Sequence, residues 1–382
     1  MKAIKQAILG AGLLAAAAVT QAGPTFEFGE EGFVELNYAL QVWSTYQSFR
    51  SPQNDAGGND IYLRRNRITL MGQQSDTIGF YAQLDAAGDS RNGNDDKAVS
   101  FRDAYLTLDY MDEVRFIVGR FKNTFSRENL EACLEPLTLD RSDQSYSPFG
   151  GTRDTGVAMW GNLADAALQY RVMISDGRET DKSPKKTPRV TARVHWSLLD
   201  PEFDYGYRGT YLGTRRVLTL GAAYDYQANA AYSDYANRSG IKDYNAWTVD
   251  AYTELPFKSG TYTLSAAYLN YGLGNAINKN SDVELPITTE LEGFYVKGGY
   301  MLPNKVGPGR LQFFARHDGV DYNLDSGILD HTLNGIGANY YINGQRLKLT
   351  AEYRQVKYAN PDKSNPALDD YKQFTFGFQF IL

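Results

Sequence analysis

The sequence predicts an all-β protein, a transmembrane antiparallel β-barrel of about 16 strands. Three observations predict this fold. Apolar and polar residues alternate along many short segments, aromatic residues make up 13% of the chain, and the connections between the segments are alternately short and long. The mean hydropathy is nevertheless only −0.45. A polar average combined with many aromatic residues fits a barrel with one face against lipid and the other against water.

The segment VELNYALQVW (34–43) shows the alternation most simply. Apolar residues recur at every second position from Val34 to Val42, and Glu35, Asn37 and Gln41 lie between them. The same period of two returns at 166–174, 190–198, 347–354 and 373–382. A run of about ten residues with this period is long enough for a tilted strand to cross a bilayer. A soluble β-sandwich alternates as well, but aromatic residues near the strand ends and the unequal connections favour a membrane barrel.

Sixteen strands follow from this pattern. They are expected near 33–43, 61–71, 79–87, 100–110, 113–121, 154–161, 164–175, 189–198, 216–226, 245–255, 260–271, 291–300, 310–318, 331–342, 346–355 and 371–382. Connections after even-numbered strands are mostly short, whereas those after odd-numbered strands are long and polar: 44–60, 88–99, 122–153, 176–188, 227–244, 272–290, 319–330 and 356–370. Outer-membrane barrels have short periplasmic turns and long extracellular loops in this way. The segment 199–215 is too long for a tight turn, so it is either an elaborated turn or a point where the strand count slips.

The first 22 residues have the composition of a secretory signal peptide. Two lysines precede an alanine-rich apolar run, and small residues follow it up to Ala22. We therefore expect a signal peptide at 1–22 and a single barrel domain at 23–382, exported to the outer membrane of a Gram-negative cell. A membrane anchor is the alternative, but the run is shorter than the ~20 apolar residues that a spanning helix needs.

The interior faces decide what such a barrel does. On these faces the sequence places Arg, Lys, Glu, Asp, Gln and Thr instead of a packed apolar core. A barrel of this size with a polar interior is expected to enclose water, which predicts a channel for passive diffusion of small hydrophilic solutes and ions. The net charge of −6 argues against a nucleic-acid partner. We expect no cofactor and no metal, because the acidic segments 54–60 and 88–97 lack the spacing of an EF-hand loop.

The stretch GRFKNTFSRENLEACLEP (119–136) interrupts the alternation with charged residues and the only cysteine, Cys133. A nucleophilic thiol needs a neighbouring base and a lowered pKa, and the three histidines lie far from Cys133 in the sequence. We therefore expect an unpaired thiol that is buried or faces the lumen, and no enzyme. A single cysteine also excludes an internal disulfide framework.

Four segments occur in an order and spacing that resemble a known family: YLRRNRITLMG (62–72), YAQLD (81–85), FRDAYLTLDY (101–110) and GRFKNTFSRENL (119–130). Together they are similar to the phosphate-selective porin O and P family of Gram-negative outer membranes. The resemblance implies a sixteen-stranded homotrimer whose third loop folds into the lumen, with anion selectivity through arginines and lysines in some members. It carries over to Arg65, Arg67, Lys122, Phe125, Ser126 and Glu128. The chain departs from the family pattern at Thr124 and at the terminal Leu382.

The predicted pore lining combines inward-facing cations of the wall with charged residues of the third loop. Its members are Arg65, Arg67, Arg115, Lys122, Arg127, Glu128, Glu131, Glu135, Arg141, Arg171, Arg193 and Lys297. One interpretation is a basic wall opposite an acidic loop, whose transverse field screens solutes. The other is that the wall cations pair with Asp85, Asp103 and Asp109 and stabilise the barrel. Because the third loop carries several carboxylates, an anion (phosphate)-preferring channel and a weakly selective general porin both remain open.

Two further classes stay as alternatives: a non-conducting structural or adhesive barrel, and an enzymatic outer-membrane barrel. The scattered histidines give little from which to build a catalytic cluster. The expected partners are further copies of the chain in a homotrimer, outer-membrane lipid and lipopolysaccharide, and small ions and solutes such as inorganic anions.

Overall fold

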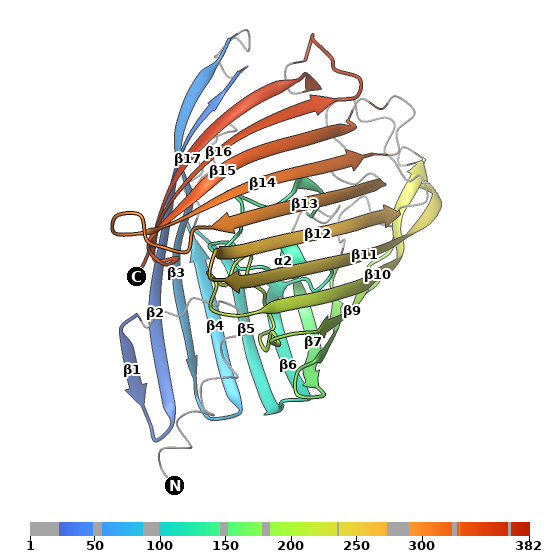
Figure 1. The fold of residues 1–382 in the computed structure, drawn as a ribbon. Helices are drawn as coiled ribbons and strands as arrows, with labels where there is room; N and C mark the ends of the chain where they lie inside the picture. The colour runs from blue at the N-terminus through green and yellow to red at the C-terminus, as the bar shows by residue number, and fades with distance from the viewer. Residues whose placement is uncertain are drawn as a thin grey trace.

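A computed structural model describes residues 23–48, 56–86, 99–145, 152–177, 184–234, 237–272, 290–322, 327, 329–365 and 368–382. Strands β2 to β17 form one closed barrel, and a short strand, β1, pairs with the first residues of β2 (Figure 1). The strands are β1 (Thr25–Phe28), β2 (Gly32–Gln47), β3 (Gly58–Gln73), β4 (Ile78–Asp85), β5 (Ser100–Met111), β6 (Val114–Lys122), β7 (Arg153–Leu163), β8 (Leu168–Ser175), β9 (Arg189–Ser197), β10 (Val217–Asp234), β11 (Ser239–Phe257), β12 (Gly260–Gly272), β13 (Leu291–Met301), β14 (Arg310–Asp321), β15 (His331–Asn343), β16 (Leu347–Tyr358) and β17 (Tyr371–Ile381). Each of the sixteen predicted strands overlaps one barrel strand, so the predicted fold is confirmed.

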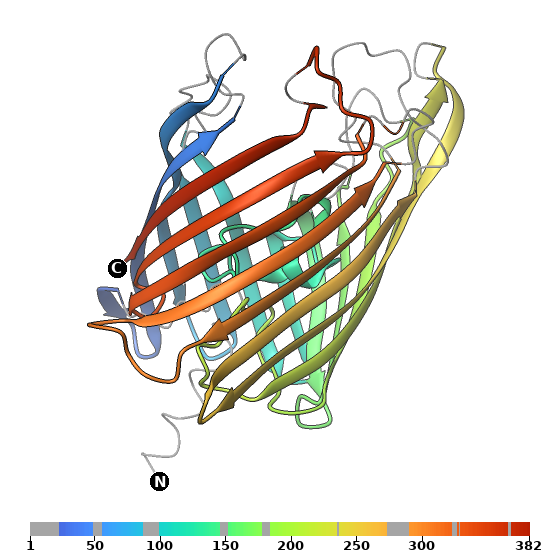
Figure 2. The same cartoon turned by 45° about the horizontal axis from the view of Figure 1, so that its top comes forward.

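The barrel closes where the last strand meets the first. β17 pairs antiparallel with β2, from Gln373 opposite Gln47 to Ile381 opposite Ala39. Figure 2 shows the strands tilted across the cylinder. A closed sheet leaves no open strand edge in lipid, where backbone N–H and C=O groups would have no hydrogen-bond partner.

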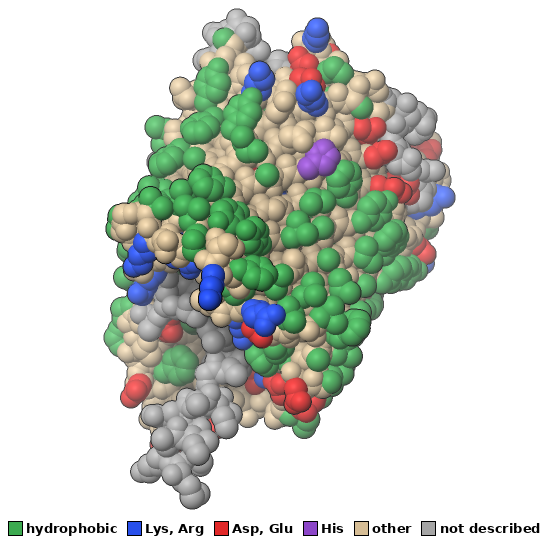
Figure 3. Space-filling view, viewed as in Figure 1, with side chains coloured by type: hydrophobic (Ala, Val, Ile, Leu, Met, Phe, Trp, Pro, Cys, Tyr) green, Lys and Arg blue, Asp and Glu red, His purple; other side chains and the backbone are tan. Residues whose placement is uncertain are grey.

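The period of two decides which side chains meet lipid. In β17, Phe374, Phe376 and Phe378 are exposed on the outer surface, whereas Gln373 and Thr375 are buried on the inner face. Successive side chains of a strand point to opposite faces, so one alternating segment supplies both surfaces. Figure 3 shows hydrophobic side chains over much of the outer surface, and charged side chains mainly toward the two ends of the barrel.

The structure differs from the expected connections at one long loop. Residues 227–244 were expected to be a loop, but β10 and β11 extend through most of this segment as a long hairpin. The register of the two strands shifts between Gln227 and Ala231, and Asn229 has a positive φ of 52°. This bulge breaks the alternation of the sequence, so the segment resembles a loop although it is paired.

Regular helices are few and short among the described residues. They are α2 (Arg127–Leu130) and a 3₁₀ turn at Asp143–Ser145, both between β6 and β7. The Ser126 side chain caps α2 by accepting a hydrogen bond from the Asn129 N–H at 3.1 Å. No helix in the described part of the chain is long and apolar enough to cross a membrane.

Candidate functional site

The described part of the third loop between β6 and β7, residues 123–145 and 152, folds into the barrel, and its base is closed by hydrogen bonds. The Asn129 side chain donates to the carbonyl oxygens of Asn123 at 2.7 Å and Thr152 at 3.2 Å. One side chain thereby joins the two ends of the loop. α2 lies within the outline of the cylinder in Figures 1 and 2, as the family resemblance implies for this loop.

Apolar side chains of the loop are packed against the inner wall. Leu134 lies against Ala39 and Ile381, at the seam where the barrel closes. Leu139 forms a second cluster with Trp43 and Tyr62. Burying a leucine of this size contributes about 1.5–3 kcal/mol.

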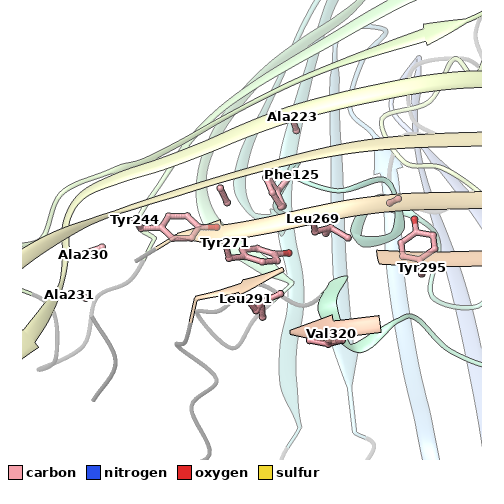
Figure 4. Close-up of a cluster of buried hydrophobic side chains, with 12 residues drawn as sticks. Phe125, Ala223, Ala230, Ala231, Tyr244, Leu269, Tyr271, Leu291, Tyr295 and Val320 are labelled. Carbon is pink, nitrogen blue, oxygen red and sulfur yellow. The ribbon is translucent and has the colours of Figure 1, made fainter. Parts of the chain in front are cut away.

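Phe125 anchors the start of the loop on the other side of the lumen. Its ring lies 5.4 Å from that of Tyr271, within the largest buried apolar cluster of the barrel (Figure 4). Together with the two leucines, this contact fixes the loop at three places around the wall.

Side chains of the far wall also hold the loop by its carbonyl groups. Lys348 and Gln379 donate to the Leu134 carbonyl oxygen at 3.2 and 3.0 Å, and Asn339 donates to that of Leu137 at 2.8 Å. These donors belong to β16, β17 and β15. The loop leaves the wall at β6 and reaches strands on the opposite side, so it crosses the lumen.

Residues 198–216, between β9 and β10, also fold into the lumen, but from the rim with the short turns. This inward turn meets the third loop through backbone hydrogen bonds: Ala132 N–H donates to the Tyr207 carbonyl at 2.8 Å, and Gly209 N–H donates to that of Glu135 at 3.1 Å. The segment was expected to be either an elaborated turn or an error in the strand count. It is an elaborated turn, and the count holds.

Ion pairs fix the inward turn in place. Arg127 of the loop binds Glu202 of the turn through two hydrogen bonds of 2.8 and 2.9 Å, and its guanidinium lies 4.0 Å from the Tyr252 ring centre. Glu254 of the wall accepts from the N–H groups of Tyr211 at 3.0 Å and Gly213 at 2.8 Å. A buried ion pair of this kind fixes one arrangement, because removing either partner leaves an unpaired charge.

Three cations of the predicted pore lining are enclosed by this packing. Arg127, Arg171 and Arg193 are 0%, 0% and 1% exposed. Arg171 donates to the Tyr205 carbonyl at 2.7 Å, and Arg193 binds Asp250 at 2.7 and 2.8 Å. The structure places them beneath the inward turn instead of on a water-filled surface. Strand parity assigns Arg171 and Arg193 to the inner face, where the structure has them, and Arg127 belongs to the third loop. The sequence does not show that the turn covers all three.

Three carboxylates of the loop pair with cations of the far wall, of the loop itself and of the turn. Glu128 pairs with Lys297 of β13. Glu131 lies 3.6 Å from Arg127, and Glu135 lies 3.4 Å from Arg208. Burial raises the pKa of both Glu131 and Glu135 to about 7, which outweighs the attraction of the neighbouring guanidinium groups.

Arg115 lies apart from the other predicted lining residues. It pairs with Asp112 and lies 3.7 Å from Asp109, near the short turn between β5 and β6. Its guanidinium group stacks over Trp160 at 4.7 Å from the ring centre. Arg115 therefore has the stabilising contacts of the second interpretation, although it faces inward.

Cations predominate on the wall formed by β3, β5, β6 and β7, together with one residue of the loop. This cationic wall consists of Arg64, Arg65, Arg67, Arg102, Lys122, Arg141 and Arg153. Its ion pairs involve three carboxylates: Asp140 with Arg64 at 2.6 Å and Arg65 at 3.2 Å, Asp85 with Arg67 at 2.8 Å, and Asp103 with Arg153 at 2.9 Å. Lys122 donates only to the carbonyl oxygens of Leu130 and Glu131 among the described residues.

Three cations of this wall, Arg64, Arg102 and Arg153, were not in the predicted lining. Strand parity assigns Arg65 and Arg67 to the inner face and therefore Arg64 to the outer face. The register between β2 and β3 shifts at Gln41 and Val42, so that neighbouring Arg64 and Arg65 both reach Asp140. The only indication in the sequence that Arg64 also faces inward was its position next to Arg65. Arg153 lies at the end of the expected loop, where the sequence does not define its direction.

Cys133 lies within this group of cations. The thiol is free and 9% exposed, and Arg141 donates to its Sγ atom at 3.1 Å. Burial disfavours the thiolate, but Arg141, Lys122 and Arg153 together hold the pKa of Cys133 well below its usual value. The expectation of a buried, unpaired thiol agrees with these contacts. No group of three or more potential metal ligands occurs among the described residues, and 88–97 lies outside them.

A cavity with about 50 Å³ of room for the centres of water-sized molecules adjoins the cationic wall and opens toward solvent. β2, β3, β4 and β5 form one side of it, and the third loop forms the other. Its lining consists of Asn37, Tyr38, Ala39, Arg67, Thr69, Met71, Tyr81, Gln83, Asp103, Lys122, Ala132, Cys133, Leu134, Arg153 and Ile381. Beside this wall the loop therefore leaves space for a solute.

Comparisons with known proteins agree with this architecture. Solved structures of similar fold include an anion-selective porin from Comamonas acidovorans, with 11% identity, a TM-score of 0.58, and coverage of 92% of this chain and 100% of that chain. OmpF of Salmonella typhi in complex with daunomycin has 13% identity and a TM-score of 0.63, over 93% and 99% of the two chains. OmpT of Vibrio cholerae in its trimer form has 11% identity and a TM-score of 0.55, over 92% and 100%. At these identities the likeness shows the fold alone.

The family comparison covers nearly the whole chain. The statistical model of the phosphate-selective porin O and P family matches residues 36–382, whereas no curated protein matches. Together with the closed barrel and its polar interior, this match makes the protein an outer-membrane channel for small solutes and not an enzyme. The chain belongs to the phosphate-selective porin O and P family.

Proposed function

We propose that this channel prefers small anions, inorganic phosphate among them. The observation that carries the proposal is the charge of the cationic wall, where seven cations adjoin three carboxylates in the part of the chain that the structure describes. The excess lies beside the cavity, and Lys122 contributes to it because its described partners are neutral carbonyl groups. A pore lined by one sign of charge concentrates counter-ions and excludes ions of its own sign.

Reversal potentials across a planar bilayer test this preference. The purified full-length protein is inserted in a bilayer that separates two KCl concentrations. We expect the reversal potential to have the sign of an anion-preferring channel, and Lys122→Gln should move this potential toward zero. Lys348→Gln is the matched control, since Lys348 also donates to a loop carbonyl but does not line the cavity. A potential near zero would identify a weakly selective general porin, and the absence of current would favour a structural barrel.

The proposal extends to assembly and export. A homotrimer is supported by the fold shared with OmpT of Vibrio cholerae, whose structure is described as a trimer form. Light scattering of the detergent-solubilised protein should give three protomers per particle. Lys2 and Lys5 with the following apolar run support cleavage of a signal peptide after Ala22, and N-terminal sequencing of the mature protein should begin at Gly23.

Lipid and lipopolysaccharide are the proposed surroundings of the trimer. Exposed aromatic residues support contact with lipid, and Phe374, Phe376 and Phe378 of β17 are examples. Co-purification of lipopolysaccharide with the outer-membrane protein, measured by mass spectrometry after gentle solubilisation, tests this proposal.

A further inference from the structure

The cavity beside the third loop has two ends of different chemistry. Register along the strands separates them: Arg67 lies at one end, Met71 pairs with Tyr81 at the other, and Asp103 lies between them, level with Gln83 and Thr69. Arg67 and Met71 are four residues apart on β3, which corresponds to about 13 Å along a strand. The site can therefore contact a charged group and an apolar group of one solute at the same time.

The charged end carries more positive than negative charge. It is lined by Arg67, Lys122 and Arg153, with Asp103 as the one lining carboxylate. Asp103 already receives two or more hydrogen bonds from Arg153, the shortest at 2.9 Å. The Lys122 amino group donates to two loop carbonyls and has no carboxylate partner among the described residues, so an entering anion would favour its charged form and supply the counter-charge.

Cys133 provides a second indication that this end favours an anion. Its Sγ atom lines the same cavity, and its pKa is held low by Arg141, Lys122 and Arg153 despite burial. The field that stabilises negative charge on sulfur also stabilises negative charge on a solute placed beside it.

The other end is apolar and belongs to the packed wall. Ala39, Leu134 and Ile381 form a separate buried cluster beside Arg67, because Ala39 pairs with both Arg67 and Ile381. Met71 and Tyr81 belong to a second cluster and are 8% and 6% exposed. Inorganic phosphate has no apolar group to place against these residues, whereas a hydrocarbon body gains about 25 cal/mol for each Å² that it removes from water there.

We propose that this cavity binds organic anions in transit, namely those with a carboxylate at one end of an apolar body, such as aromatic monocarboxylates. The carboxylate lies between Lys122, Arg67 and Arg153, and the body lies against Met71 and Tyr81. This proposal rests on the proposed anion preference of the channel and adds the class of anion that is held longest.

Block of the chloride current in planar bilayers tests this inference with four probes at pH 7.4. Benzoate carries both groups, acetate has the carboxylate without the body, benzamide has the body without the charge, and phosphate is the inorganic anion. We expect benzoate to halve the current at a concentration at least tenfold below those of the other three. Equal potency of benzoate and acetate overturns the inference.

Two variants separate the contributions of the two ends. Lys122→Gln should raise the half-blocking concentration of benzoate at least fivefold and leave that of benzamide unchanged. Met71→Gln keeps the length of the side chain. It should raise the half-blocking concentration of benzoate to a value close to that of acetate. Lys258→Gln, at an exposed lysine in the short turn between β11 and β12, is the control and should leave all four values unchanged. If Lys122→Gln inserts and conducts normally but blocks like the wild type, the inference is wrong.

The reversal potential in KCl distinguishes failure of this inference from failure of the proposed function. An anion-preferring channel on which benzoate and acetate act equally overturns the inference alone. A cation-preferring channel overturns the proposed function and with it the basis of the inference.

Discussion

Arg127 and Glu202 enter the barrel from opposite rims and form an ion pair inside it, with two hydrogen bonds of 2.8 and 2.9 Å. The arginine belongs to the third loop, and the glutamate belongs to the inward turn between β9 and β10. Both side chains are almost fully buried. The pair connects the two segments that fill the lumen, so its strength bears on whether they stay together.

Breaking this pair from one side should be more harmful than removing both charges. Arg127→Met leaves Glu202 buried with Tyr211 and His195 as its neighbours, and such a change costs roughly 3–5 kcal/mol. The double variant Arg127→Met with Glu202→Gln should cost less than the sum of the two single variants. Urea unfolding of the protein in liposomes measures these differences. Additive effects would show that the pair does not act as a unit.

Selectivity should depend on pH near neutrality. Burial raises the pKa of Glu131 and Glu135 to about 7 from the usual 4.5, so both carboxyl groups gain negative charge between pH 6 and pH 8. We therefore expect the anion preference to weaken as the pH rises through 7. Reversal potentials at pH 6 and pH 8 measure the change, and the double variant Glu131→Gln with Glu135→Gln should abolish it.

The carboxyl groups of Glu131 and Glu135 also make the folded protein less stable as the pH rises. The folded protein holds protons on them that the unfolded chain releases above about pH 4.5, so their contribution is most favourable below that pH and is lost as the pH rises to 7. The wild type should thus lose more stability between pH 5 and pH 8 than the double glutamine variant. Equal pH dependence of the two proteins in urea unfolding would contradict this assignment.

Loosening the loop from the wall should increase the noise of the current. Leu139 packs against Trp43 and Tyr62, and Leu139→Ala removes buried contacts worth about 2–5 kcal/mol. The loop should then leave the wall more often, which open-channel recordings would detect as more frequent fluctuations of the current. Leu382→Ala, at an exposed position on the outer surface, is a control that should leave the noise unchanged.

Removing the inward turn should widen the channel without opening the barrel. Replacing 199–215 with Asn-Gly keeps the pairing of β9 with β10, which runs from Ser197 opposite Thr219 to Arg189 opposite Gln227. The space that the turn occupies would fill with water, so we expect a higher single-channel conductance. An unchanged conductance in a folded variant would mean that solutes pass elsewhere.

The sixteen strands could be predicted from the sequence because alternation is a local property that each strand shows by itself. The inner or outer position of most side chains follows from the same period, as for Arg171 and Arg193. Arg64 could not be placed, since a one-residue shift in the pairing with β2 reverses its side. A register shift depends on two strands, and one strand alone does not reveal it.

The position of the inward turn inside the lumen could not be predicted for a different reason. Its tyrosines, glycines and charged residues have the composition of a surface connection, and only the contacts with the third loop and with Glu254 show that it lies inside. For the same reason, the burial of Arg127 beneath this turn could not be predicted. Burial inside a lumen depends on which segments contact each other there. Contacts between segments that are distant in the chain cannot be read from a local sequence pattern.

The junction of the third loop with the inward turn also has an electrical consequence. Two narrow zones that lie one behind the other add their resistances, and each can be widened separately. Here Glu131 bridges Tyr207 in parallel pairing, so the loop and the turn meet at the same depth in the barrel. The loop and the turn therefore form one narrow zone instead of two in series. A substitution in either segment changes the electrical resistance of this zone for ions that enter from either side.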